Sequence, residues 1–243
     1  STPPVNPGIY TVVATITDPN YSGTTGNQTL TIGPITPPMI LSLDPGSSNP
    51  SLYGTAVAFD LDVDNGAAPA PCPTGTVQFY VNGTPSGLPV PLPLTCNSSL
   101  FYQIATLPLG SDSIYASYSG DANYPPTNSL PLTQVVSADA TGVSLTILPG
   151  TTINVGGAIT FTATVTPSPA IDAGASGPGG SVSFYECVST ATTCNSSNGT
   201  LLGTAQLSGA SPYTAQLVNP ALAEGTWAIG AVYTSSDDEF TGS

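Results

Sequence analysis

The sequence predicts an all-β protein made of two-sheet sandwiches, and three observations support this. Apolar and polar residues alternate over many short segments, while no long stretch has the 3.6-residue period of a helix. Glycine and proline, 26 residues each in a chain of 243, separate those segments as turns. The segments also return about 100 residues further along the chain, which therefore consists of repeated units.

Three elements make up the repeat. Residues 56–63 (AVAFDLDV) return as residues 158–165 (AITFTATV), and residues 75–80 (GTVQFY) return as residues 180–185 (GSVSFY). The third element ends in an acidic-aromatic turn at residues 18–21, 121–124 and 237–240. Every second residue of the first element is apolar, which is typical of a half-buried strand with one face on a core.

The predicted strands follow one another between the turns. Residues 1–32 supply only a two-stranded hairpin, and the proline-rich residues 33–38 form a linker. The middle unit has strands near residues 39–45, 55–63, 75–82, 85–90, 100–106, 112–119 and 127–136. After a short linker at 136–141, the last unit has strands near residues 143–149, 157–166, 180–188, 199–206, 212–218 and 226–233, without a seventh. We therefore expect domains at residues 1–36, 37–138 and 139–243.

A unit of about 100 residues with about seven short strands is the immunoglobulin-like pattern. Residues 75–80, with LPLG at 107–110 and ASYSGDANY at 116–124, resemble the bacterial Ig-like repeat domains of the group 3 type. Residues 8–21 (GIYTVVATITDPNY) are similar to the last hairpin of the Gly-rich bacterial surface β domains. The resemblance implies tandem Ig-like β-sandwiches, incomplete at both ends. The short linkers predict an extended rod.

The charge of the chain excludes most catalytic chemistry. It has no Lys, Arg or His against 14 Asp and Glu, so the formal net charge is −14. Proton transfer near neutral pH lacks its usual base, and Ser–His–Asp or Cys–His nucleophile systems are excluded. No side chain can neutralise a phosphate backbone, so we expect no nucleic-acid partner. A carboxylate-pair glycosidase remains an alternative, but sandwiches of this size seldom hold a deep cleft. We predict that the protein is not an enzyme.

The setting of the chain is predicted to be extracellular or the cell surface. No run of 18 apolar residues encodes a membrane span. Four cysteines in a Thr/Ser-rich β chain fit an oxidising compartment. Six sequons are candidates for glycosylation, although a chain rich in Asn, Ser and Thr also forms sequons by chance; they begin at Asn20, Asn27, Asn82, Asn97, Asn195 and Asn198.

The cysteines are predicted to form disulfides. Pairing within each unit joins Cys72 to Cys96 and Cys187 to Cys194, which is one of three possible connectivities. A zinc site is disfavoured because the chain has no CxxC motif and no histidine.

Two groups of acidic residues are candidates for Ca²⁺ binding. Asp60, Asp62 and Asp64 share the outer face of one predicted strand, about 7 Å apart, so one ion would also need ligands from a loop. The alternative is a solvated face that protects a sheet edge. Asp237, Asp238 and Glu239 form the second group, and its alternative is a simple turn. We expect the two alternatives, and hence no cofactor.

Trp227 is predicted to pack in the core. It lies two residues before Ile229 and therefore on the apolar face of its strand. The competing interpretation is a carbohydrate-stacking platform formed with the tyrosines.

These observations predict a non-catalytic module of a secreted microbial surface protein, acting as a stalk, spacer or filament subunit. The alternative is an adhesin arm that binds glycan or protein through its loops or through the Asp60, Asp62 and Asp64 face. Expected partners are neighbouring Ig-like repeats or identical subunits arranged head to tail. In the second case residues 1–32 of one subunit would complete the last sandwich of the next.

Overall fold

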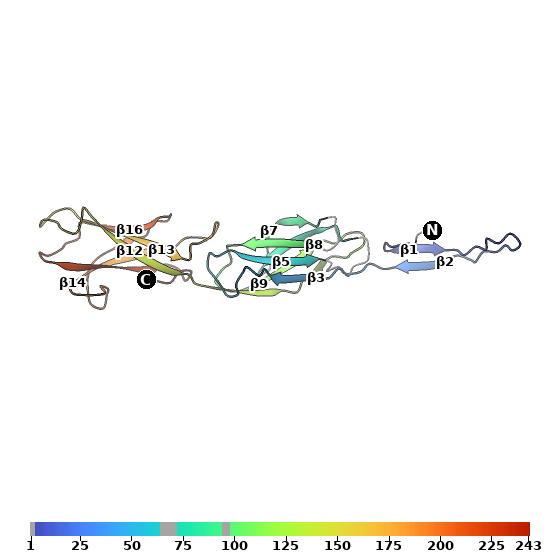
Figure 1. Ribbon diagram of the computed structural model, residues 1–243, viewed down its shortest axis with the longest axis horizontal. Helices are drawn as coiled ribbons and strands as arrows, with labels where there is room; N and C mark the ends of the chain where they lie inside the picture. Colours follow the sequence, from blue (N-terminus) through green and yellow to red (C-terminus); the bar gives the residue numbers. More distant parts are fainter. Residues whose placement is uncertain (1–2, 64–71, 94–97) are drawn as a thin grey trace. The chain divides into compact units, whose positions relative to one another are not determined.

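The computed structural model describes residues 3–63, 72–93 and 98–243, and every regular element in these ranges is a β-strand (Figure 1). The predicted all-β fold is confirmed. The described elements include no helix that could cross a membrane. The chain divides into two compact units. The first comprises Ser1–Ser47, Ala58–Gln103 and Asp112–Gln134, and the second comprises Ser48–Val57, Ile104–Ser111 and Val135–Ser243.

The N-terminal residues form an antiparallel hairpin of β1 (Gly8–Val12) and β2 (Gln28–Ile32), in which Gly8 lies opposite Ile32. Its period-two alternation predicts a half-buried pair of strands, yet its apolar side chains are largely exposed, with Ile9 and Tyr21 among them. A two-stranded hairpin has no second sheet against which one face could be buried.

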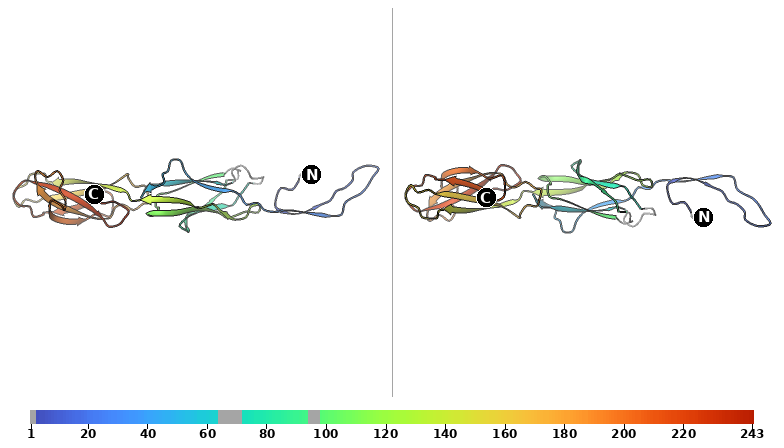
Figure 2. Two further views of the ribbon diagram at one scale, coloured as in Figure 1. Left: turned by 90° about the horizontal axis from the view of Figure 1, so that it is seen from below. Right: turned by 90° about the horizontal axis from the view of Figure 1, so that it is seen from above.

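The middle sandwich pairs two sheets, visible as two layers in Figure 2. One sheet has the order β3-β5-β8 and the other β4-β11-β9-β6-β7, with β10 also paired to β9. The bounds are β3 (Met39–Leu43), β4 (Ser51–Leu52), β5 (Val57–Val63), β6 (Thr76–Val81), β7 (Thr84–Pro91), β8 (Ser98–Ile104), β9 (Gly110–Tyr118), β10 (Thr127–Asn128) and β11 (Leu132–Ser137). Inward residues of both sheets, including Leu61, Phe79 and Tyr118, form one buried cluster. The alternation read from the sequence therefore marks the core-facing side chains.

The C-terminal sandwich repeats this arrangement with fewer strands. Its two sheets have the orders β12-β13-β16 and β15-β14-β17. The bounds are β12 (Ala140–Leu148), β13 (Thr160–Ser168), β14 (Gly180–Val188), β15 (Thr200–Gln206), β16 (Tyr213–Val218) and β17 (Trp227–Ser235). Phe161 and Phe184 stack across the core at a centroid distance of 6.2 Å.

The passage from β11 to β12 is shorter than the predicted linker at residues 136–141. Only two residues separate the strands, because Ala140 already pairs with Ser168. Asp139 is fully buried, its N–H donates to the Glu239 carbonyl at 2.9 Å, and its own carbonyl accepts the Thr241 N–H at 2.8 Å. The passage is therefore held at Asp139 by hydrogen bonds to the backbone of Glu239 and Thr241.

Strand β17 is an edge strand of its sheet in the described part of the chain. In the middle sandwich, the equivalent β9 is flanked by β11, and Ile114 and Ala116 are fully buried. Their counterparts Ile229 and Ala231 are only half-buried. The backbone of Ser243 pairs with that of Tyr233, as Thr127 pairs with Tyr118 in the middle sandwich.

Candidate functional site

The acidic-aromatic turn of the middle sandwich is organised by Asp121. Its Oδ1 accepts the N–H groups of Asn123 at 2.7 Å and Tyr124 at 2.9 Å. Its Oδ2 accepts the Thr74 N–H at 2.7 Å, the Thr74 hydroxyl at 3.1 Å and the Tyr118 hydroxyl at 2.9 Å. Tyr124 is 2% exposed. The carboxylate therefore closes the turn and joins it to the residue that precedes β6 by two positions.

The ionisation of this cluster suits a structural role. Burial alone would raise the pKa of the Asp121 carboxyl, but the N–H groups of Asn123 and Thr74, the Tyr118 hydroxyl and the Tyr124 N–H hold that pKa below its usual value. Burial, assisted by the hydrogen bond to Asp121, raises the pKa of Tyr118 to about 12. Both shifts stabilise the forms that prevail near neutral pH, the Asp121 carboxylate and the neutral Tyr118 hydroxyl.

The two other acidic-aromatic turns use their carboxylates in the same local way. Asp237 Oδ1 accepts the Glu239 N–H and the Ser235 hydroxyl, both at 3.2 Å, and Asp18 Oδ1 accepts the Asn20 N–H at 2.7 Å. The aromatic residue is buried at Phe240 but 72% exposed at Tyr21. The turn chemistry is thus local, whereas burial of the aromatic ring depends on which other residues pack against it, such as Tyr53 against Phe240.

The candidate Ca²⁺ ligands do not converge in the described ranges. Asp60 is half-buried on β5, Asp62 is exposed, and Asp64 lies outside the described residues. Asp238 is exposed, while burial, assisted by the nearby Glu239 side chain, raises the pKa of the Tyr53 hydroxyl. Among residues 3–63, 72–93 and 98–243, no three Asp, Glu, His or Cys side chains are close enough to hold one ion.

Two buried carboxylates escaped the sequence analysis. Asp112 Oδ1 accepts the Asn82 side-chain N–H at 2.7 Å, and Asp139 Oδ1 accepts the Ala140 N–H at 2.8 Å. The second oxygen of each has no hydrogen-bond partner in the described part of the protein. Burial raises the pKa of the Asp139 carboxyl, against a smaller opposing effect of the Ala140 N–H. Asp112 lies near the start of β9 and Asp139 between two strands, where an Asp is common in sequence, so no sequence pattern predicted that these two are buried.

The sequons differ in how far their asparagines are available. The Asn82 amide donates to Asp112, and the Asn198 amide donates to the Thr193 carbonyl at 2.7 Å. The side-chain Oδ1 of Asn195 accepts the Ser197 N–H at 2.9 Å. Asn20 and Asn27 have exposed side chains, and Asn97 lies outside the described residues.

Cys187 and Cys194 form a disulfide with a Cα–Cα distance of 5.7 Å. It closes the loop that follows β14, and this loop packs directly on β17, where the Cys194 carbonyl lies against Gly230. Cys72 is also disulfide-bonded. Its predicted partner, Cys96, lies outside the described residues, so that pairing stays a prediction.

Replacing both Cys187 and Cys194 by serine is expected to lower the free energy of unfolding of the C-terminal sandwich by about 2–3 kcal/mol, because the short closed loop restricts the unfolded chain. Urea unfolding monitored by the amide resonances of β14 and β17 would measure the change. The middle sandwich serves as the internal control, and a comparable loss there would contradict the local explanation.

The prediction that Trp227 packs in the core is wrong. Its indole is 36% exposed and donates to the Ala223 carbonyl at 3.0 Å. The sandwich opens at this end into a groove of about 940 Å³, which Ile153, Leu222 and Trp227 help to line. The residue is on the apolar face, but the opposite sheet does not cover that face here.

On the middle sandwich, the outer rings of Tyr80 and Tyr115 stack at a centroid distance of 4.9 Å.

Acid is expected to change the stability little, because no basic side chain exists to accumulate positive charge. The lowered pKa of Asp121 provides stability above its unfolded pKa, and this is lost as the pH falls through the folded pKa. The raised pKa of Asp139 acts oppositely, so stability is gained as the pH falls through its folded pKa. We expect melting temperatures at pH 7 and pH 2 within about 10 °C by circular dichroism. A drop of several tens of degrees would contradict this balance.

Comparison with known families agrees with the sequence resemblance. Residues 44–137 match the bacterial Ig-like domain (group 3), and residues 1–36 match the MBG domain. One similar solved structure is that of the CbhA fibronectin(III)-like modules of Clostridium thermocellum. Its sequence identity is 16%, the match covers 84% of this chain and 90% of that chain, and the TM-score is 0.29. A putative membrane-anchored protein from Corynebacterium diphtheriae has 15% identity, 95% and 65% coverage and a TM-score of 0.31. Apo β-glucuronidase 3 of Bacteroides uniformis has 14% identity, 85% and 24% coverage and a TM-score of 0.30. A comparison with curated proteins found no match.

Proposed function

Because the chain carries a bacterial Ig-like domain of group 3 at residues 44–137 and an MBG domain at residues 1–36, we propose that it is a non-catalytic structural module of a secreted microbial surface protein. It acts there as a stalk or spacer. The disulfide between Cys187 and Cys194 supports an oxidising, extracellular setting.

The observation that carries the proposal is the passage from β11 to β12. A spacer must keep its length under load, and a flexible linker between modules would not. Asp139 is buried in this passage and bonded through its N–H, its carbonyl and one carboxylate oxygen. These bonds fix the backbone of Asp139 against Glu239 and Thr241, which suits an element that must keep its length.

The competing function is an adhesin arm, and two surfaces favour it. One is the outer face of β5 with Asp60 and Asp62, and the other is the stacked pair of Tyr80 and Tyr115. A glycan array with the whole chain separates the two functions. A spacer should give no binding above background. Saturable binding that is lost in the double variant Tyr80→Ala, Tyr115→Ala would instead support the adhesin function. Antibody labelling of intact cells of the source organism tests the surface location.

The partners are proposed to be neighbouring Ig-like repeats, with identical subunits head to tail as the alternative. The edge of β17, which pairs only with Ser243 in the described part of the chain, and the exposed hairpin of β1 and β2 are the surfaces that a second copy would use. Sedimentation over a range of protein concentrations distinguishes these two kinds of partner. A chain that stays monomeric at all concentrations supports neighbouring repeats as the partners. Polymers that grow with concentration, and that the substitution Ile229→Asp prevents, support head-to-tail assembly.

A further inference from the structure

Two turns at equivalent positions of the two sandwiches have the same backbone conformation. Gly54 and Gly156 adopt φ angles of 74° and 75°. In the first turn the Thr55 N–H donates to the Leu52 carbonyl, and in the second the Gly157 N–H donates to the Asn154 carbonyl. Each turn leads into a strand of the repeated element, β5 or β13. We call residues 51–56 the first turn and residues 153–158 the second turn; both belong to the second unit.

The first turn is covered by the loop that follows β13. The Asp172 N–H donates to the Gly54 carbonyl, and the Asp172 Oδ2 accepts the Ala56 N–H, both at 2.7 Å. Ile171 lies against Gly54, and the Phe240 ring meets the Tyr53 ring edge-on at 5.5 Å. Tyr53 is 6% exposed as a result. One aspartate thus binds the turn at two points, and apolar side chains close around it.

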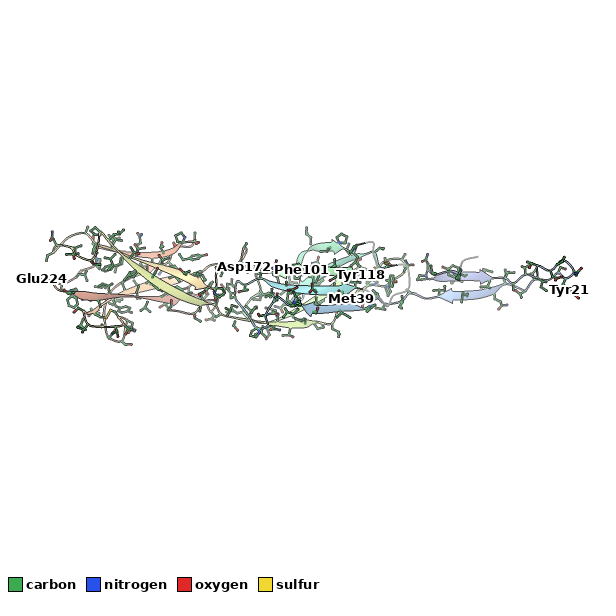
Figure 3. The ribbon with its side chains drawn as sticks, viewed as in Figure 1. Tyr21, Met39, Phe101, Tyr118, Asp172 and Glu224 are labelled. Carbon is green, nitrogen blue, oxygen red and sulfur yellow. A yellow bond between two sulfur atoms is a disulfide. The ribbon has the colours of Figure 1, made fainter. Side chains whose placement is uncertain are left out.

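The second turn carries the same donor and acceptor without an occupant. Val155, at the position of Tyr53, is 85% exposed, and no atom lies within 4 Å of where a Gly156 Cβ would stand. The Ala158 N–H and the Gly156 carbonyl have no hydrogen-bond partner among the residues that the structure describes. The groove beside them is lined by Ile153, Leu222 and Trp227. Glu224, on the same groove, and Asp172 lie at opposite ends of the C-terminal sandwich (Figure 3).

We propose that the second turn is the docking seat for an aspartate-bearing loop of another Ig-like module. That aspartate accepts the Ala158 N–H and donates its own N–H to the Gly156 carbonyl, as Asp172 does at the first turn. The chemistry suits this chain, because without Lys, Arg or His only N–H and O–H groups can receive a carboxylate. The proposal rests on the proposed function, since it specifies how such modules join.

The test extends the whole chain by one module. Residues 128–243 are appended after Ser243, because Ser243 bonds Tyr233 as Thr127 bonds Tyr118. We expect hydrogen exchange at the Ala158 amide to slow at least tenfold relative to the unextended chain. Replacing the equivalent of Asp172 by alanine in the appended copy should restore the original rate, whereas the same change at the equivalent of the exposed Asp238 should not. A folded tandem in which Ala158 exchanges at the unextended rate overturns the proposal.

If the extended chain does not fold, the proposal can be tested on the unextended chain. Asp172→Ala should accelerate hydrogen exchange at the Ala56 amide at least tenfold and leave the exchange rate of Ala158 unchanged. An unchanged exchange rate at Ala56 would show that Asp172 does not protect the first turn, and this would overturn the proposal. A capped peptide of residues 171–176 should shift the amide resonances of Gly156, Gly157 and Ala158, and its Asp→Ala version should not. Absence of shifts with the first peptide overturns the proposal. Neither result bears on glycan binding, so failure of the docking seat is distinguishable from failure of the spacer function.

Discussion

Replacing Asp121 by alanine should destabilise the middle sandwich by about 3–5 kcal/mol, because buried polar groups that lose a charged partner retain their desolvation penalty. The substitution removes the acceptor of the Thr74, Asn123 and Tyr124 N–H groups and of the Tyr118 hydroxyl. It also releases Tyr124, whose ring closes the core. Urea unfolding followed through the amide resonances of β5 and β9 measures the loss.

Asp18→Ala is the matched control, since Asp18 occupies the same position in the hairpin but accepts a single N–H beside an exposed Tyr21. Its effect on the unfolding of the middle sandwich should be nil. The difference between wild type and Asp121→Asn should also shrink as the pH falls below about 4, because Asp121 of the unfolded chain then takes up a proton before the folded carboxylate does. Equal losses for Asp121→Ala and Asp18→Ala would contradict the role assigned to this carboxylate.

Gly180→Ala should destabilise the C-terminal sandwich by at least about 3 kcal/mol, through backbone strain and overpacking together. Gly180 adopts a φ of 117°, which side chains of L-residues rarely tolerate. An added Cβ would also meet the Thr234 carbonyl oxygen and lie 2.8 Å from the Ser236 nitrogen, at the point where β14 pairs with the end of β17. Neither backbone group can move without opening that pairing.

Gly142→Ala provides the comparison within the same sandwich. Gly142 is a strand residue of β12, it has no positive φ, and no atom lies within 4 Å of its would-be Cβ. Alanine there should leave the stability unchanged or raise it slightly, since it restricts the unfolded chain. Chemical denaturation of both variants decides the matter: similar midpoints for Gly142→Ala and Gly180→Ala would show that neither strain nor crowding operates at Gly180.

The alternation of apolar residues predicted the strands well where a sandwich surrounds them. Phe59, Leu61 and Val63 were placed on one face by sequence, and all three are buried. The same alternation misled at the ends of the molecule. Val12 in the hairpin and Trp227 at the start of β17 lie on apolar faces, but no second sheet covers them in the described part of the chain. Periodicity assigns a side chain to a face, and burial depends on whether another element lies over that face.

The candidate sites show the same division. The turns at Asp18, Asp121 and Asp237 were predictable because an Asp that binds the N–H two residues on is a local interaction. The pairing of Asp172 with Ala56 joins residues 116 positions apart, and the burial of Asp112 depends on Asn82. The conformation of Gly54 is likewise invisible in a sequence where 26 glycines occur.

By itself, the sequence determined the all-β class, the repeated Ig-like unit and the lack of any basic side chain, because each depends on local alternation or on composition. Only the tertiary structure decided which carboxylates are buried, how Asp139 is held between β11 and β12, and which of two equivalent turns is covered. The physical reason is that hydrogen bonds and desolvation act between neighbours in space. Two residues far apart in the chain become neighbours only when the sheets pack.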